Sequence, residues 1–146
     1  GMLPVQSWVD SFHTGYNLEC ISDYMKYTGD DVYVTNVNQG LSYYVNTFFT
    51  KEGIPKYYNN SIYPIDVHAP AQMVITLARL GRFHEYKELM DTVLYWTIKN
   101  MQSKGGFFYY QINKFFSSKI PYMRWAQAWM FYALSTYTKF ENRDQD

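Results

Sequence analysis

Hydrophobic residues recur every three or four positions in five stretches of the chain, and this spacing predicts five helices. In the second stretch, one helical face carries Val34, Val37, Leu41, Tyr44 and Phe48. In the fourth stretch, one side carries Tyr86, Met90, Val93, Thr97 and Met101. The predicted helices span residues 13–27, 32–49, 67–80, 84–101 and 123–137.

Residues that favour helix ends stand at several of these boundaries. Gly29 and Gly81 follow the first and third helices, where a glycine readily adopts the left-handed conformation that ends a helix. Asp30 or Asp31 is expected to cap the second helix. Pro70 suits the first turn of the third helix, where a missing N–H has no consequence.

The predicted helices are of two kinds. The third and fifth contain AQMVITLARL and WAQAWMFYAL, which are apolar nearly all round and are therefore expected to be buried on most sides. The second and fourth have one apolar and one charged face, as helices of an outer layer do. Alternating inner and outer helices predict an all-α fold of tandem αα-hairpins, part of a two-layer α/α-toroid. The first helix is more polar than the other two inner helices.

A repeat of about 55 residues supports this arrangement. The double tyrosine at 57–58 recurs at 109–110, a shift of 52, and Pro64 aligns with Pro121. Segments 53–65 and 105–120 alternate aromatic and polar residues around turn residues such as Asn59, Asn60 and Ser61. These segments are predicted to be small β-hairpins. Each leads into an inner helix, so both are expected at the end of the fold where the inner helices begin.

Composition narrows the class of protein. The 146 residues form one domain by size, and 47% are hydrophobic, which argues against disorder. Thirteen basic residues balance thirteen acidic ones, so neither a nucleic-acid partner nor a polybasic membrane surface is expected. No apolar run is long enough to span a membrane. A single cysteine, Cys20, forms no internal disulfide. These features predict a cytoplasmic protein, and Gly1 before Met2 resembles the remnant of a cleaved tag.

Aromatic residues are the outlying feature, at 21% of the chain with 16 tyrosines and 4 tryptophans. Most are accounted for by an aromatic core. The remainder suit a carbohydrate partner, because sugar rings pack their C–H faces on aromatic rings while Tyr and Trp offer polar tips to hydroxyl groups.

Polar residues gather where the three inner helices are predicted to begin. Asp10 and His13 stand at the first start, Asp66 and His68 at the second, and Arg124 at the third. If the helices converge, a histidine could act as general base with a carboxylate to orient it, and the arginine could hold a carboxylate. Helix N-terminal dipoles at the same end would favour an anionic group such as a uronate. The catalytic candidates are His13, His68, Asp10 and Asp66.

Structural roles are the alternative for each of these residues. Asp10 and Asp66 also fit N-cap or turn positions, and both histidines fit a structural role. Glu19 fits a buried hydrogen-bond anchor, or one member of a paired-carboxylate glycosidase site with Asp10 or Asp66. The substrate-binding candidates are Arg124, Trp125, Tyr16, Asn17, Gln72, Gln127, Tyr57 and Tyr109. No nucleotide-binding or metal-binding motif is present, so no cofactor and no metal are expected.

Several segments resemble one bacterial family. They are WVDSFHTGYNLE, YYVNTFF, PKYY, YPIDVHAPAQ, WTIKNMQ, GFFYYQ and IPYMRWAQAWMFYAL, which cover the chain from about residue 8 to 138. Together they resemble the C-terminal part of a family with the six-hairpin glycosidase-like fold. That family is similar in shape to N-acylglucosamine 2-epimerases and to the C-terminal domain of glucuronyl C5-epimerases. The resemblance implies an α/α-toroid linked with polysaccharide metabolism.

The resemblance leaves two functions open. A closed toroid of this kind has six hairpins, whereas five helices supply about two and a half. The chain is therefore expected to form a homo-oligomer or to be completed by a missing half-toroid. One hypothesis is an epimerase, lyase or hydrolase acting on a glycan that contains uronic acid or amino sugar. The other is a non-catalytic fragment that binds glycan or assembles with a partner.

Overall fold

The computed structural model describes residues 7–143, so Gly1 lies outside the described residues. The described chain is mostly helical, with a small antiparallel sheet. Its α-helices are α1 (Ser11–Thr28), α2 (Val34–Phe48), α3 (His68–Arg79), α4 (Lys87–Met101) and α5 (Trp129–Arg143). A π-helix, η2 (Met123–Ala128), leads directly into α5. The strands are β1 (Ile65–Asp66), β2 (Gln111–Ile112) and β3 (Ser117–Ser118).

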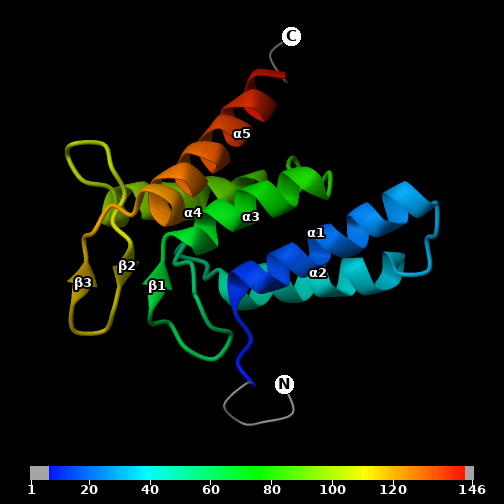
Figure 1. Cartoon of the computed structure of the whole chain (residues 1–146), viewed down its shortest axis with the longest axis horizontal. Helices are drawn as coiled ribbons and strands as arrows, with labels where there is room; N and C mark the ends of the chain where they lie inside the picture. Colours follow the sequence, from blue (N-terminus) through cyan, green and yellow to red (C-terminus); the bar gives the residue numbers. More distant parts are fainter. Residues whose placement is uncertain (1–6, 144–146) are drawn as a thin grey trace.

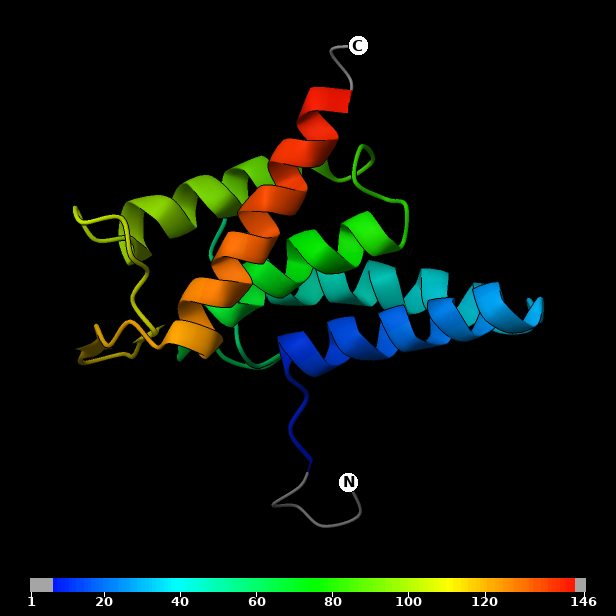
Figure 2. The same ribbon diagram turned by 45° about the horizontal axis from the view of Figure 1, so that its top comes forward.

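The helices lie in two layers (Figure 1). Helices α1, α3 and α5 form one layer, and α2 and α4 lie behind it, as the tilted view in Figure 2 makes clear. Helix α3 is central, because it packs against α1 on one side and α5 on the other and also contacts α4. The core lies between the layers and includes Tyr44, Phe48, Met73, Met90 and Met130, none of which is exposed to solvent.

The repeat is present, but equivalent residues lie 53 positions apart, one more than the shift of 52 predicted from the double tyrosines. Phe49 bridges Pro55 after α2, and Gln102 bridges Phe108 after α4, 53 residues further along. The turns between them contain Gly53 and Gly106, both with positive φ. Tyr57 therefore corresponds to Tyr110 and not to Tyr109.

In each repeat unit, which comprises a front-layer helix, a back-layer helix and the segment that follows, an equivalent backbone hydrogen bond joins the end of the unit to its start. The amide of Ser11, at the start of α1, donates to the carbonyl of Tyr57, and the amide of Val67 donates equivalently to Tyr110. Each chain segment that leaves a back-layer helix thus returns to the start of the front-layer helix of its own unit. As a result, the repeat brings the functional candidates at the helix starts next to the aromatic segments.

Two expectations about the extended segments have different outcomes. Segment 105–120 contains a hairpin, in which β2 pairs antiparallel with β3. Segment 53–65 forms no hairpin of its own: Tyr58 bridges Asp10, and β1 pairs with β2. The reason is that the helix starts offer free backbone groups to the returning chain. The result is one three-stranded sheet in the order β1-β2-β3.

The helix ends agree in part with the predicted caps. Gly29 is left-handed, and its amide donates to the carbonyl of Met25. Gly81 also has positive φ and follows α3. Neither aspartate caps α2, which begins with Tyr33 as its N-cap, because Asp30 accepts from the amide of Val32 in the preceding turn.

Helices α3 and α5 differ in burial, although both were expected to be buried on most sides. Residues 68–77 of α3 are all buried. In α5, Met130 and Ala133 are buried against the core, whereas Phe131 is 75% exposed and Tyr132 is 47% exposed. The difference arises because α3 has neighbours on both flanks, while the far flank of α5 meets no other helix of the described chain.

Candidate functional site

Asp10 and His13 form a hydrogen-bonded pair at the start of α1. Asp10 is the N-cap of the helix and accepts from the backbone amide of His13 at 2.8 Å. Its second oxygen lies 2.8 Å from Nδ1 of His13. Asp10 is only 3% exposed, whereas the His13 side chain is 64% exposed. The carboxylate therefore orients the imidazole and leaves Nε2 facing solvent, an arrangement that suits a general base.

His68 lies at the start of α3 and is 1% exposed. Its ring stacks on Phe12, with ring centroids 5.1 Å apart, and also contacts Trp125 and Trp129. Its Nε2 is 3.2 Å from the hydroxyl of Tyr16. Burial lowers the pKa of His68 to about 4, so the ring is neutral near pH 7. Its surroundings are those of a buried aromatic residue with one polar contact.

Asp66, the last residue of β1, is completely buried. Its Oδ1 accepts from the amide of His68 at 2.9 Å, and its Oδ2 accepts from Nε2 of Gln111 at 3.1 Å. Burial raises the pKa of Asp66 to about 6, although these hydrogen bonds oppose the rise. Asp66 thus joins β1 and β2 to the start of α3, and its oxygens face protein groups.

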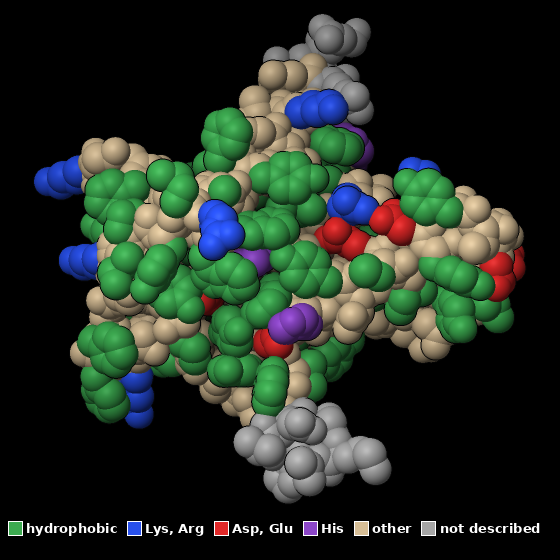
Figure 3. Space-filling model, viewed as in Figure 1, with side chains coloured by type: hydrophobic (Ala, Val, Ile, Leu, Met, Phe, Trp, Pro, Cys, Tyr) green, Lys and Arg blue, Asp and Glu red, His purple; other side chains and the backbone are tan. Residues whose placement is uncertain are grey.

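An aromatic pocket at the start of η2 lies beside His68, whose ring contacts Trp125 and Trp129. The pocket has a volume of about 550 Å³ and is lined by Tyr122, Met123, Arg124, Trp125 and Trp129. A second hollow is lined by Tyr110 and shares Tyr122 and Trp125 with the first. Figure 3 shows hydrophobic side chains gathering on this face of the molecule, over the start of α5 and the β2–β3 hairpin, with a basic side chain among them.

The π-helix shapes the wall of this pocket. The carbonyl of Tyr122 accepts from both Ala126 and Gln127, and the second of these bonds spans five residues. The side chain of Gln127 holds the turn in place, since it accepts from the amide of Phe108 at 2.9 Å and donates to the carbonyl of Phe108 at 2.7 Å. Short π-helical segments are rare and frequently occur at functional sites. Here the segment presents Arg124 and Trp125 to the pocket.

The other predicted binding residues are distributed unevenly. Tyr16 packs edge-on against Trp129, with centroids 6.0 Å apart, and is close to the pocket. Tyr57 packs on Phe12, and burial raises the pKa of Tyr57 strongly. Asn17 is exposed on α1. Tyr109 contacts Phe107 and the Lys119 ammonium in the hairpin region.

Gln72 and Gln127 do not line the pocket. Gln72 is fully buried between α1 and α3, where its Nε2 donates to Glu19 at 2.6 Å. Gln127 is occupied by the backbone of Phe108. Both face other helices or loops because the close packing of α3, and the π-turn in η2, direct their side chains inward.

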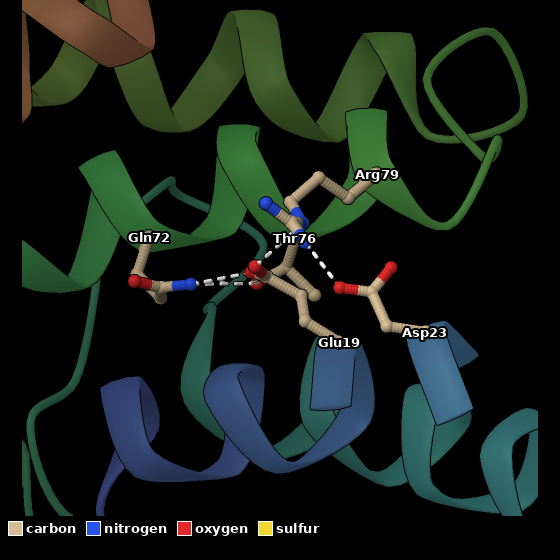
Figure 4. Close-up of polar contacts among 5 residues, drawn as sticks. All are labelled: Glu19, Asp23, Gln72, Thr76 and Arg79. Carbon is tan, nitrogen blue, oxygen red and sulfur yellow. Dashed lines mark hydrogen bonds and ion pairs between the residues drawn. The ribbon is translucent and has the colours of Figure 1, made fainter. Parts of the chain in front are cut away.

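Glu19 is the buried hydrogen-bond anchor that its position in α1 suggested. Its Oε1 accepts from Gln72 and from the Thr76 hydroxyl, each at 2.6 Å, and its Oε2 pairs with Nε of Arg79 at 3.0 Å (Figure 4). Arg79 also bonds to Asp23. Burial raises the pKa of Glu19, while Thr76 and Arg79 act against the rise.

Tyr122, Met123 and Trp129 line the pocket but were absent from the candidates. A signal for Trp129 exists in the sequence, because it follows Trp125 by four residues and so shares its helical face. Tyr122 and Met123 reach the pocket because the chain turns into η2 at that point, a feature without a simple sequence pattern.

Within residues 7–143, no helix is long and apolar enough to cross a membrane. No group of three or more His, Cys, Asp or Glu residues in that range is placed to hold a metal ion. Comparison of the chain with protein-family models, curated proteins and solved structures found no match.

Proposed function

We propose that the pocket lined by Tyr122, Met123, Arg124, Trp125 and Trp129 binds a carbohydrate that carries a carboxylate, such as a uronic acid. The observation that carries this proposal is the combination of two tryptophans and one exposed arginine in a single hollow. Its volume of about 550 Å³ falls within the range of about 300–1,000 Å³ typical of small-ligand sites.

The roles of the pocket residues follow from their chemistry. Trp125 is 43% exposed, so one part of its ring is free to pack on the C–H face of a sugar. Arg124 offers a planar fork of N–H donors that matches a carboxylate. Tyr122 adds a second exposed ring with a hydroxyl group. A neutral sugar would use the rings alone, whereas a uronate would use the rings and the arginine.

Calorimetric titration with a short oligouronide and with a neutral oligosaccharide of the same length tests this function. Trp125→Ala is expected to weaken both by roughly tenfold or more, through loss of the stacking surface. Arg124→Gln is expected to weaken the oligouronide by roughly tenfold and to leave the neutral sugar unchanged. Equal affinity of wild type and both variants for the oligouronide would refute the assignment.

Two exposed residues on the back layer provide matched controls. Tyr95→Ala removes an aromatic ring that is 68% exposed on α4, and Lys99→Gln removes one positive charge from the same helix. Neither residue lines the pocket, so both variants are expected to bind like wild type. A loss in either control as large as that of its pocket counterpart would show that the effects are not local.

Catalysis is the second candidate function, and it rests on the Asp10–His13 pair. Of the four catalytic candidates, Asp10, Asp66 and His68 are buried, and only His13 presents a reactive atom to solvent. A single exposed base favours binding over turnover for this chain. If the wild-type protein does convert an oligouronide, His13→Ala is expected to abolish the conversion while preserving affinity. Unchanged turnover in that variant would exclude His13 as the base.

The arrangement of helices is the basis for proposing a partial α/α-toroid of the six-hairpin glycosidase-like kind. Alternating front and back helices, and units closed by their own returning strands, support it. In such a ring the flank of α5 carrying Phe131 and Leu134 would be covered by a further hairpin or by a second copy of the chain. Light scattering is expected to show an oligomer, and a monomer across the micromolar range would contradict coverage by a second copy.

A further inference from the structure

A line of polar groups runs between α1 and α3, from the buried carboxylate of Glu19 to the hydroxyl of Tyr16, whose ring packs against Trp129 of the pocket. Glu19 bonds to Gln72 at one end, and His68 bonds to Tyr16 at the other. His68 and Gln72 stand four residues apart on α3, so their side chains are neighbours on one face of the helix. The site residues and the buried anchor are therefore linked through one helix face.

The orientation of the Gln72 amide is fixed by its partners. Its Nε2 donates to Glu19 at 2.6 Å and to the Thr76 hydroxyl at 3.0 Å, and that hydroxyl in turn donates to Glu19. An ionised carboxylate only accepts hydrogen bonds, so the NH₂ group must face it. The amide oxygen consequently points away from Glu19, towards the N-terminal end of α3 (Figure 4).

Two buried atoms on this line lack a hydrogen-bond partner within the described chain, namely Oε1 of Gln72 and Nδ1 of His68. An unpaired buried polar atom is costly. The oxygen only accepts, so the two atoms complement one another when Nδ1 carries the proton of the neutral imidazole.

We propose that Glu19 and Gln72 hold His68 as the Nδ1–H tautomer, so that Nε2 accepts the hydroxyl proton of Tyr16. The Tyr16 oxygen then keeps its lone pairs for a hydrogen bond from a hydroxyl group of the bound sugar. His68 and Gln72 are positioning residues, and Tyr16 is the residue that contacts the ligand. The ligand contact rests on the proposed carbohydrate-binding function, whereas the tautomer does not.

The close packing that this line requires is visible at Gly15. A Cβ atom there would lie 2.7 Å from Oγ1 of Thr76, 2.9 Å from Cγ of Gln72 and 3.3 Å from the hydroxyl of Tyr44. The absence of a side chain at this position allows α1 to approach α3 closely enough for Glu19 to reach Gln72 and for Tyr16 to reach His68. The helix approach and the polar line are therefore parts of one arrangement.

Nitrogen-15 NMR of the imidazole rings tests the tautomer directly, because protonated and unprotonated ring nitrogens have well-separated shifts. Wild-type His68 at pH 7 is expected to carry its proton on Nδ1. Gln72→Met removes the acceptor at similar volume and is expected to move the proton to Nε2. Thr76→Val keeps Gln72 beside His68 and is expected to keep the Nδ1–H form. A wild-type Nε2–H form, or an unchanged tautomer in Gln72→Met, would overturn the proposal that Glu19 and Gln72 set the tautomer of His68.

Calorimetry with the oligouronide tests the ligand contact. Tyr16→Phe is expected to weaken binding by roughly 3- to 10-fold through loss of one hydrogen bond. Tyr132→Phe is the matched control, because its ring also packs against Trp129, at 6.3 Å between centroids. Equal affinity in wild type and Tyr16→Phe would overturn the contact alone. No binding by wild type would refute the proposed function and with it this contact. The NMR measurement would still test whether Glu19 and Gln72 hold His68 as the Nδ1–H tautomer.

Discussion

The buried carboxyl of Asp66 gives a prediction whose size follows from the structure. Asp66→Asn keeps an oxygen to accept from the amide of His68 but cannot ionise. In the folded protein, burial raises the pKa of Asp66 from 3.8 to about 6. The folded state thus binds the proton more tightly than the unfolded state does, so ionisation favours unfolding. The contribution of Asp66 to stability falls as the pH rises through the interval from 3.8 to about 6.

Each pKa unit corresponds to about 1.4 kcal/mol, so wild type is expected to lose about 2–3 kcal/mol relative to Asp66→Asn between pH 4 and pH 7. Urea unfolding followed by tryptophan fluorescence at pH 4, 5, 6 and 7 measures the difference. The comparison with the variant is essential because His68 acts in the opposite direction. Its pKa is lowered from 6.5 to about 4, so its contribution to stability grows over much of the same interval.

Asn17→Ala, at an exposed position on α1, removes no ionisable group and is the control, so its stability difference from wild type is expected to stay constant with pH. An equally constant difference between Asp66→Asn and wild type would contradict a raised pKa for Asp66 in the folded protein. A gain in wild-type stability relative to the variant with rising pH would contradict it as well.

Three further substitutions test the packing of the site, each by urea unfolding at pH 7. Gly15→Ala is expected to destabilise the fold by about 1–3 kcal/mol, because the added Cβ would overlap Thr76. Glu19→Ala is expected to cost about 2–4 kcal/mol, since it leaves buried donors on α3 without an acceptor. Asp10→Ala removes the N-cap of α1 and is expected to cost about 1 kcal/mol.

Each of these substitutions has a control in the same chain. Gly105→Ala meets nothing closer than 3.6 Å and is expected to be neutral, so an equal loss there would remove the argument from Gly15. Asp23→Asn tests the partly exposed pair with Arg79, which is expected to contribute less than about 1 kcal/mol. Asp10→Asn retains a capping oxygen, and a loss as large as that of Asp10→Ala would show that capping is not the cause.

The sequence predicted the helices well because their patterns are local. The apolar faces of α2 and α4 and the C-terminal glycines depend on spacings within a few turns, and the repeat only requires that two segments of the chain have similar residues in the same order. The pairing of strands was harder to predict from the sequence, because some partners are far apart along the chain. Segment 53–65 was expected to fold back on itself, but Tyr58 pairs with Asp10, far away in the sequence. The packed helices bring the start of α1 to this segment, where the amide of Ser11 donates to the carbonyl of Tyr57 and the amide of Asn59 donates to the carbonyl of Val9.

The candidate site was predicted in outline and corrected in detail. Clustering of Asp10, His13, His68 and Trp125 follows from the convergence of helix starts, which the repeat indicated. Burial could not be read from the same pattern. His68 is buried among aromatic rings and Asp66 is buried within β1, and burial shifts the pKa of each group.

The central claim, that the pocket beside η2 receives a uronate-bearing sugar, is tested most directly by the indole N–H signals of the four tryptophans. Trp125 and Trp129 line the pocket, whereas Trp96 lies on α4 and Trp8 precedes α1. On titration with the oligouronide, the signals of Trp125 and Trp129 are expected to shift together and to saturate, while those of Trp96 and Trp8 stay in place. Saturable shifts confined to Trp96 or Trp8, or no shift in any of the four, would contradict the account.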